Sequence, residues 1–154
     1  MKKLLTPFVL LLLGCLLFPS GCNNTGRIVV AGLRVETTGL ERSSDGTTRV
    51  TWRMVNPNIA PYLLTRVSQK VFLNNTLVGT ILDKEAMAVP AQDHASRTSR
   101  LVPAGPAADR LIAEAVGQGP VSYRMEAELM IQLYGETIEK GEISGAGSVK
   151  VTGK

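Results

Sequence analysis

The sequence predicts a mainly β protein: an antiparallel β-sandwich of the fibronectin or immunoglobulin-like type, with seven or eight strands and one short helix. Short runs in which apolar and polar residues alternate are separated by turn residues at the spacing of a sandwich. Gly and Pro are frequent, with 15 and 8 residues. Hydrophobic residues make up 44% and charged residues 19% of the chain, which excludes a disordered protein.

The length and the net charge of the chain further limit the classes of protein to which it can belong. The 154 residues correspond to one domain that can bury a core without disulfides or metals. The net charge of +4 includes Lys2 and Lys3, which belong to an N-terminal leader. The remaining charge, and an aromatic content of 5%, are too low for a nucleic-acid-binding surface.

The N-terminus has the pattern of a bacterial lipoprotein signal peptide, predicted over residues 1–21. Lys2 and Lys3 precede an apolar stretch that is shorter than the ~20 residues needed to span a bilayer. Gly21-Cys22 then resembles a lipobox, so Cys22 is the predicted site of lipid attachment and residues 22–27 a lipidated tether. The sandwich domain is predicted over residues 28–154, and the membrane is the partner expected through the lipid.

Other interpretations of the leader remain open. Cys15 follows Leu12-Leu13-Gly14 and fits the lipobox better, but processing there would leave an apolar mature N-terminus. An uncleaved anchor helix and a Cys15–Cys22 disulfide are further alternatives. With Asn23 after the Cys, rather than the Asp that retains lipoproteins in the inner membrane, we expect an anchor in the outer membrane, facing the periplasm, if the cell is Gram-negative.

The first half of the domain contains six expected strands. They cover residues 28–35, 47–55, 66–73, 76–82, 87–89 and 96–102. Residues 37–46 are polar and are expected to form a turn. Asn74-Asn75 is a hairpin signal, because Asn tolerates a positive φ. Pro90 ends the fifth strand, and both the fifth and the weakly apolar sixth are expected at sheet edges.

The second half contains the helix and the clearest strand. Ala108, Leu111, Ile112 and Ala115 fall at i, i+3, i+4 and i+7, which predicts a helix that begins near Pro106. Residues 121–134 alternate between apolar and polar over most of their length and predict a long strand. A last strand is expected over 137–151, where three glycines indicate a bulge or a close backbone approach.

The second strand and the turn after it are the organising segment. Val50, Trp52 and Met54 alternate with polar residues, and Trp52, the single Trp, is the predicted centre of the core. Asn56-Pro57-Asn58 follows. Pro57 lacks a donor and Asn side chains bond nearby backbone, so the segment is predicted to be a structural turn rather than a binding site.

These residues also carry a resemblance. The relevant segments are Asn56-Pro57-Asn58, Leu63-Leu64, Val67-x-x-x-Val71-x-Leu73-Asn74, Leu77-Val78-Gly79 and Val89-Pro90-Ala91. Together they resemble the WHy domain of the late-embryogenesis-abundant (LEA) type 2 family, named for water stress and hypersensitive response. The resemblance covers about residues 28–151. It implies a β-sandwich of fibronectin-like topology with one helix, and a role in stress tolerance without known catalysis.

No pattern in the chain predicts catalysis, a metal or a cofactor. His94 is the single His, and although Asp93, Ser96 and Ser99 are near it in sequence, we interpret it as a solvated loop residue. Asp83, Glu85 and Asp93 lack the spacing of a Ca²⁺ loop. The glycines from 141 to 147 lack the Lys and the helix of a phosphate loop.

A pair of carboxylates also fails to indicate an enzyme. Glu126 and Glu128 stand about 7 Å apart on one strand face, a spacing that a glycosidase could use. That face points outward, where nothing raises the pKa of a general acid.

The functional prediction is a non-enzymatic envelope lipoprotein that protects proteins or membranes under water loss, cold or heat. Partly unfolded client proteins and lipid headgroups are the expected partners, and nucleic acid is not. The alternative is a binding or assembly module that presents a sandwich edge or its end loops to a protein or lipid. An exposed apolar patch or an uncovered edge strand favours this alternative.

Overall fold

The computed structural model describes residue 30, residues 32–133 and residues 137–154. Within these residues it contains nine strands and one helix. In chain order they are β1 (Arg34–Arg42), β2 (Thr48–Asn56), β3 (Tyr62–Leu73), β4 (Thr76–Asp83), β5 (Met87–Val89), β6 (Asp93–Pro103), α3 (Pro106–Ala115), β7 (Val121–Leu133), β8 (Thr137–Val149) and β9 (Val151–Gly153).

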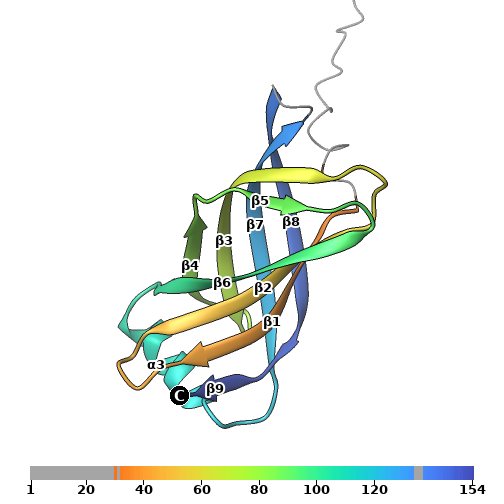
Figure 1. The fold of residues 1–154 in the computed structure, drawn as a ribbon. Coiled ribbons are helices and arrows are strands. Elements are labelled where there is room, and N and C mark those ends of the chain that lie inside the picture. Colours follow the sequence, from red (N-terminus) through yellow and green to blue (C-terminus); the bar gives the residue numbers. More distant parts are fainter. Residues whose placement is uncertain (1–29, 31, 134–136) are drawn as a thin grey trace, which may run out of the picture.

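The strands form two facing layers (Figure 1). In the first layer, which we call sheet A, β6, β2 and β1 pair antiparallel, and β9 pairs parallel with β1. In the second layer, sheet B, β3 pairs antiparallel with β4, β5 and β7, and β7 pairs with β8 along its whole length. The architecture is therefore the predicted mainly β fold with one short helix, and β9 is the exception to antiparallel pairing.

The two layers are connected along both sides. At one side β6 leaves sheet A, and its last residues pair with β4, through Gly79 with Pro103 and Thr80 with Val102. At the other side β8 of sheet B continues through Lys150 into β9 of sheet A. The two layers are thus joined at both flanks by strands that they share.

Alternate residues of both layers fill the space between them. Trp52 is fully buried, and its indole Nε1 donates a hydrogen bond to Ser99 Oγ at 3.0 Å. Ser99 in turn donates to Asp83 Oδ2 at 2.6 Å, which links sheet A to the end of β4. Trp52 is therefore at the centre of the core, as its position in an alternating strand predicted.

The interior also contains polar groups without partners. Gln69 is 1% exposed between Val67 and Val71, and neither its Nε2 nor its Oε1 has a hydrogen-bond partner among the described residues. The same holds for Thr37 Oγ1, although the Thr37 backbone N–H donates to the Tyr123 hydroxyl at 3.0 Å. Such groups cost free energy, because burial removes their bonds to water.

The helix covers one end of the sandwich (Figure 1). Pro106 occupies the first turn, where its missing N–H costs nothing, and Ala108, Ile112 and Ala115 are the buried residues of the helix. Arg42 at the end of β1 donates two hydrogen bonds to the Asp109 carboxylate, at 2.7 and 2.9 Å. This contact with Arg42 holds the pKa of Asp109 below its usual 3.8 and raises the pKa of Arg42.

In the described part of the chain, no helix is long and apolar enough to cross a membrane.

The structure corrects the expected boundaries of four elements. The first strand is β1, and it continues through Thr37 to Arg42, where a polar turn was expected. Its earlier expected residues, 28, 29 and 31, lie outside the described residues. β3 begins at Tyr62 rather than after Thr65, and β6 begins at Asp93. The expected last strand is divided into β8 and β9, so there are nine strands in the described residues and not seven or eight.

Broken alternation explains two of these errors. A bulge between Thr37 and Gly39 places Val35, Thr37 and Leu40 inward, so the period of two is lost. A second irregularity, between Leu64 and Arg66, has the same effect in β3. The prediction of an edge position holds for β5 and for only part of β6, since β6 also pairs with β4.

The expected close approach at the glycines of the last strand is confirmed. A Cβ at Gly145 would lie 1.8 Å from the backbone oxygen of Val35, and a Cβ at Gly141 would lie 2.0 Å from Val30 Cγ1. Only glycine lets β8 pass β1 at this distance. The Asn74-Asn75 hairpin is also confirmed, with φ values of 46° and 66°.

Candidate functional site

The turn between β2 and β3 is held together by one side chain. Asn56, fully buried at the end of β2, donates two hydrogen bonds from Nδ2, to Ala60 O at 2.8 Å and to Pro90 O at 2.9 Å. Its Oδ1 accepts the backbone N–H of Asn58 at 2.9 Å. These three bonds satisfy the amide and fix the turn against the neighbouring β5–β6 turn.

The backbone completes this connection, since Gln92 N donates to Asn58 O at 2.9 Å. Pro57 begins the turn and Pro61 ends it, so the chain has few alternative conformations there. Between the two prolines, Ile59 is 87% exposed. The motif Asn56-Pro57-Asn58 therefore builds a rigid turn whose apolar tip is in solvent.

This turn lies beside the place where the chain enters the sandwich. Gly32 has a φ of 80°, and a Cβ there would lie 3.2 Å from Pro57 Cγ. Val30 packs against the core, and its carbonyl accepts the N–H of Leu33 at 3.1 Å. The beginning of β1 is therefore adjacent to the β2–β3 and β5–β6 turns (Figure 1).

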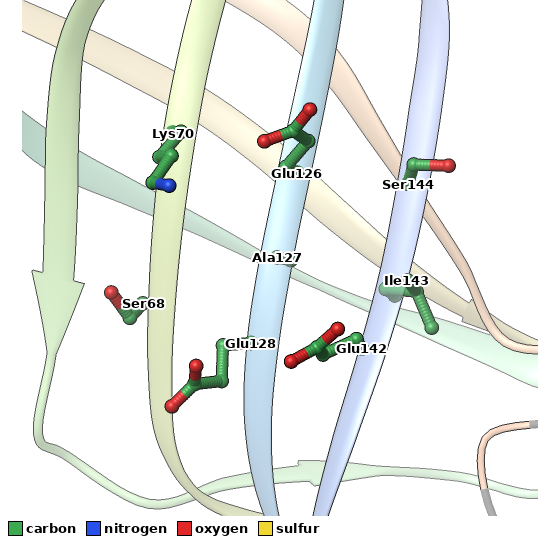
Figure 2. A pocket seen from close by; sticks show the side chains of 8 residues that line it. All are labelled: Ser68, Lys70, Glu126, Ala127, Glu128, Glu142, Ile143 and Ser144. Atoms are coloured by element: carbon green, nitrogen blue, oxygen red, sulfur yellow. The ribbon is translucent and has the colours of Figure 1, made fainter. Parts of the chain in front are cut away.

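A second candidate site is a shallow depression on the outer face of sheet B, where β3, β7 and β8 lie side by side. Figure 2 shows Glu126 and Glu128 of β7 between Lys70 of β3 and Glu142 of β8. The depression has a volume of about 420 Å³. Its lining residues are Ser68, Lys70, Glu126, Ala127, Glu128, Glu142, Ile143 and Ser144.

The charges of this depression are arranged in ion pairs. Lys140 Nζ lies 2.8 Å from Glu128 Oε2 and 3.4 Å from Glu142 Oε1, and the pair with Glu128, followed by that with Glu142, raises the pKa of Lys140. Arg124 pairs with Glu126 and also stacks on the Phe72 ring, 3.7 Å from its centroid. The Glu126 and Glu128 side chains are about half exposed, at 44% and 50%, which is not the apolar pocket that a catalytic acid needs.

The residues near the single His do not assemble into a nucleophilic site. His94 Nδ1 lies 3.1 Å from Asp93 Oδ1, and both side chains are at least half exposed. Ser99 points to the opposite face and is bonded to Trp52 and Asp83. Among the described residues, no group of three or more His, Cys, Asp or Glu side chains could hold a metal ion.

The remaining predicted site residue, Cys22, lies outside the described residues. The outer-face depression was not predicted from the sequence. One signal in the sequence was that Lys70, Glu126 and Glu128 occupy the polar positions of alternating strands. These side chains lie together only because of the pairing register of β3, β7 and β8. In that register Lys70 is opposite Glu126, and Glu126 is opposite Ser144.

Comparisons with known proteins give similarities of fold. No family model and no curated protein matches the sequence. A protein from Archaeoglobus fulgidus matches with a TM-score of 0.45 and 11% identity, over 76% of this chain and 93% of that chain. The solution structure of a candidate late embryogenesis abundant (LEA) protein matches with a TM-score of 0.47 and 9% identity, over 95% of this chain and 87% of that chain.

A further solution structure, from Arabidopsis thaliana, matches with a TM-score of 0.47 and 17% identity, over 79% of this chain and 80% of that chain. These similarities concern the path of the backbone and assign no activity or partner to this chain.

Proposed function

We propose that the chain is a non-enzymatic lipoprotein of the cell envelope, with a WHy-type sandwich that protects proteins or membranes during water loss, cold or heat. The observation that carries the proposal is the role of Asn56 in the segment that resembles the WHy domain. Its side chain joins the β2–β3 turn to the β5–β6 turn. Two of the segments that resemble the WHy domain, those with Asn56 and Pro90, are therefore joined to each other in the fold.

The protective activity would arise from weak contacts of a folded surface with partly unfolded chains or lipid headgroups. The test is to dry, freeze or heat a labile enzyme with and without the purified protein, and to measure the enzyme activity that remains. We expect more activity than with an equal mass of an unrelated folded β-sandwich protein. Equal recovery with the two proteins would contradict the protective function.

A second candidate function, a binding or assembly module, is favoured by a different observation. β6 pairs with β2 from Asp93 to Leu101, but on its other side it pairs with β4 only at Val102 and Pro103. Most of this edge is therefore unpaired among the described strands, and an extended segment of another protein could add to it.

The module hypothesis is tested by co-purification from envelope extracts, with and without dehydration stress. Ser96→Lys and Thr98→Lys place charges beside the open edge of β6, and we expect them to prevent a partner strand from adding. A partner that is retained by both variants would exclude this edge as the binding surface.

A further inference from the structure

Ile59 is the most exposed of the large hydrophobic residues that the structure describes. It is 87% exposed, against 59% for Val102 and 53% for Leu82. A single exposed apolar residue is common on protein surfaces. Ile59 differs because the segments around it are also uncharged, and because they lie where the chain enters the fold.

The uncharged surface extends over two turns. Residues 56–65 include no Asp, Glu, Lys or Arg, and residues 86–92 include none either. The hydrogen bond from Gln92 N to Asn58 O joins the two turns, so they form one surface. We call residues 57–61 and 90–92 the uncharged tip. A tip of this composition avoids the high desolvation cost of a charged side chain when it enters a less polar medium.

The uncharged tip is also rigid. Asn56 holds Ala60 and Pro90 through its Nδ2, and Pro57 and Pro61 restrict the backbone on both sides of Ile59. A preorganised loop loses little conformational entropy when it binds. Ile59 is thus presented to solvent in a fixed position, without the freedom to fold back onto the core.

The position of the uncharged tip depends on the proposed lipid at Cys22, so this inference rests on the proposed function. Only residues 23–29 separate Cys22 from Val30, and eight residue steps span at most about 29 Å. A Cβ at Gly32 would lie 3.2 Å from Pro57 Cγ, so the described part of the chain enters the sandwich beside the tip. The Val121 end of β7 lies at the opposite end of this 13-residue strand, which extends about 41 Å, because Gln132 near its other end pairs with Leu63.

The charges around the tip fit an anionic surface. Arg34 is exposed at the start of β1, opposite Val55, and it has no ion pair among the described residues. Asp93 is the nearby acid in the β2–β6 register, and His94 lies within ion-pair distance of it. Phosphate headgroups attract Arg34, while the uncharged tip has no acidic side chain to repel them.

We propose that the uncharged tip is a membrane-contact site, which places Ile59 in the interfacial region of the phospholipid bilayer that holds the lipid anchor. The anchor then orients the sandwich as well as retaining it, because the lipid and Ile59 are two attachments on one end of the domain. A second attachment on the same end of the domain adds to the binding by the lipid and restricts the orientation of the sandwich.

The test uses the full lipoprotein, reconstituted into vesicles of phosphatidylethanolamine and phosphatidylglycerol. Because Cys15 belongs to the leader and Cys22 is acylated, a new cysteine is the single free thiol of the mature chain. An environment-sensitive fluorophore is attached at Ile59→Cys or, as the matched control, at Leu82→Cys. Nitroxide groups on the lipids then report whether each probe enters the bilayer.

We expect the probe at residue 59 to shift to shorter wavelength and to be quenched about twofold or more by shallow nitroxides, while the probe at residue 82 stays in water. A probe at Ala91, in the neighbouring turn, should also be quenched, and Ile59→Asp should reduce that quenching about threefold or more. This second measurement does not depend on a fluorophore in place of Ile59.

Three results would overturn the proposal. If the protein floats with the vesicles but the probes at residues 59 and 91 are not quenched, the lipid anchor is present and the membrane contact of the tip is excluded. Equal quenching at residues 59 and 82 excludes a specific tip. A probe that is shielded in native envelopes but not in lipid vesicles indicates a protein partner instead. Failure of the proposed function is distinct: a chain without the lipid, shown by the mass of its N-terminal peptide, does not float with the vesicles.

Discussion

Asn56 is a residue whose side chain replaces backbone pairing where a strand ends. Asn56→Ala leaves the carbonyls of Ala60 and Pro90 without their donor. The loss should be about 1–3 kcal/mol in the free energy of unfolding, measured in denaturant melts. Protection of a labile enzyme should persist at temperatures where the variant is still folded.

Asn56→Asp serves as the control of nearly equal size, since it also removes both N–H donors and should lower stability at least as much. The contrary result is an unchanged melting curve together with lost protection. It would mean that the segment is a binding site and not a structural turn.

Replacement of Gln69 should have the opposite effect on stability. Its amide is buried and has no partner among the described residues, so the folded state carries an unpaired polar group. Gln69→Leu should raise the free energy of unfolding by about 1–2 kcal/mol, because it removes that group at similar volume. The exposed Gln118, changed to Leu, should alter stability by less than about 0.5 kcal/mol. A loss of stability in Gln69→Leu would indicate that the amide binds an internal water.

At the scale of elements, β8 depends on a glycine to pass β1. Gly145→Ala places a methyl group where the Val35 carbonyl oxygen lies, so β1 and β8 must separate. We expect a loss of at least about 1–3 kcal/mol in thermal or denaturant unfolding. Gly119, where an added Cβ would meet no atom within 4 Å, provides the control, and Gly119→Ala should be nearly neutral. Equal stability of both variants would show that the two strands are not in contact.

The contact between α3 and β1 should depend on pH. The bond from Arg42 lowers the pKa of Asp109 in the folded protein below the usual 3.8. The stabilisation is therefore fully present above about pH 5, and it is lost as the pH falls through the two pKa values of the folded and unfolded states. Unfolding free energies of the wild type and Asp109→Asn, compared between about pH 2 and 7, should begin to converge below about pH 4 and coincide only below the lowered pKa of the folded state. A constant difference across that range would contradict the ion pair.

Local patterns predicted those elements in which each residue follows one period. β7 was predicted correctly because its inward residues alternate with polar residues, Met130 excepted. The inward residues are Tyr123, Met125, Ala127, Leu129 and Ile131. The boundaries predicted for β1 were wrong because the bulge after Thr37 breaks the period, and Gly39 was the only local sign of that bulge. The outer-face depression could not be predicted, since it depends on a register between strands that are distant in the sequence.

At the scale of the whole molecule, the lipid anchor is the first property to test. Cys22→Ser, or treatment with globomycin, should cause an unprocessed precursor to accumulate, visible as slower migration in gels of fractionated cells. Cys15→Ser is the matched control and should be processed normally. If Cys15→Ser blocks processing while Cys22→Ser migrates and fractionates like the wild type, the anchor is at Cys15.

The parallel pairing of β9 with β1 has a consequence for how fast the protein reaches its native state. Leu40 pairs with Val151, more than a hundred residues later in the chain. Contacts of such long sequence separation require a large loop to close, and all-β sandwiches accordingly fold in milliseconds to seconds rather than microseconds. Until Val151–Gly153 arrive, the outer edge of β1 is open to other strands. A chain exported in the unfolded state would therefore benefit from a holding chaperone until its last strands have crossed the membrane.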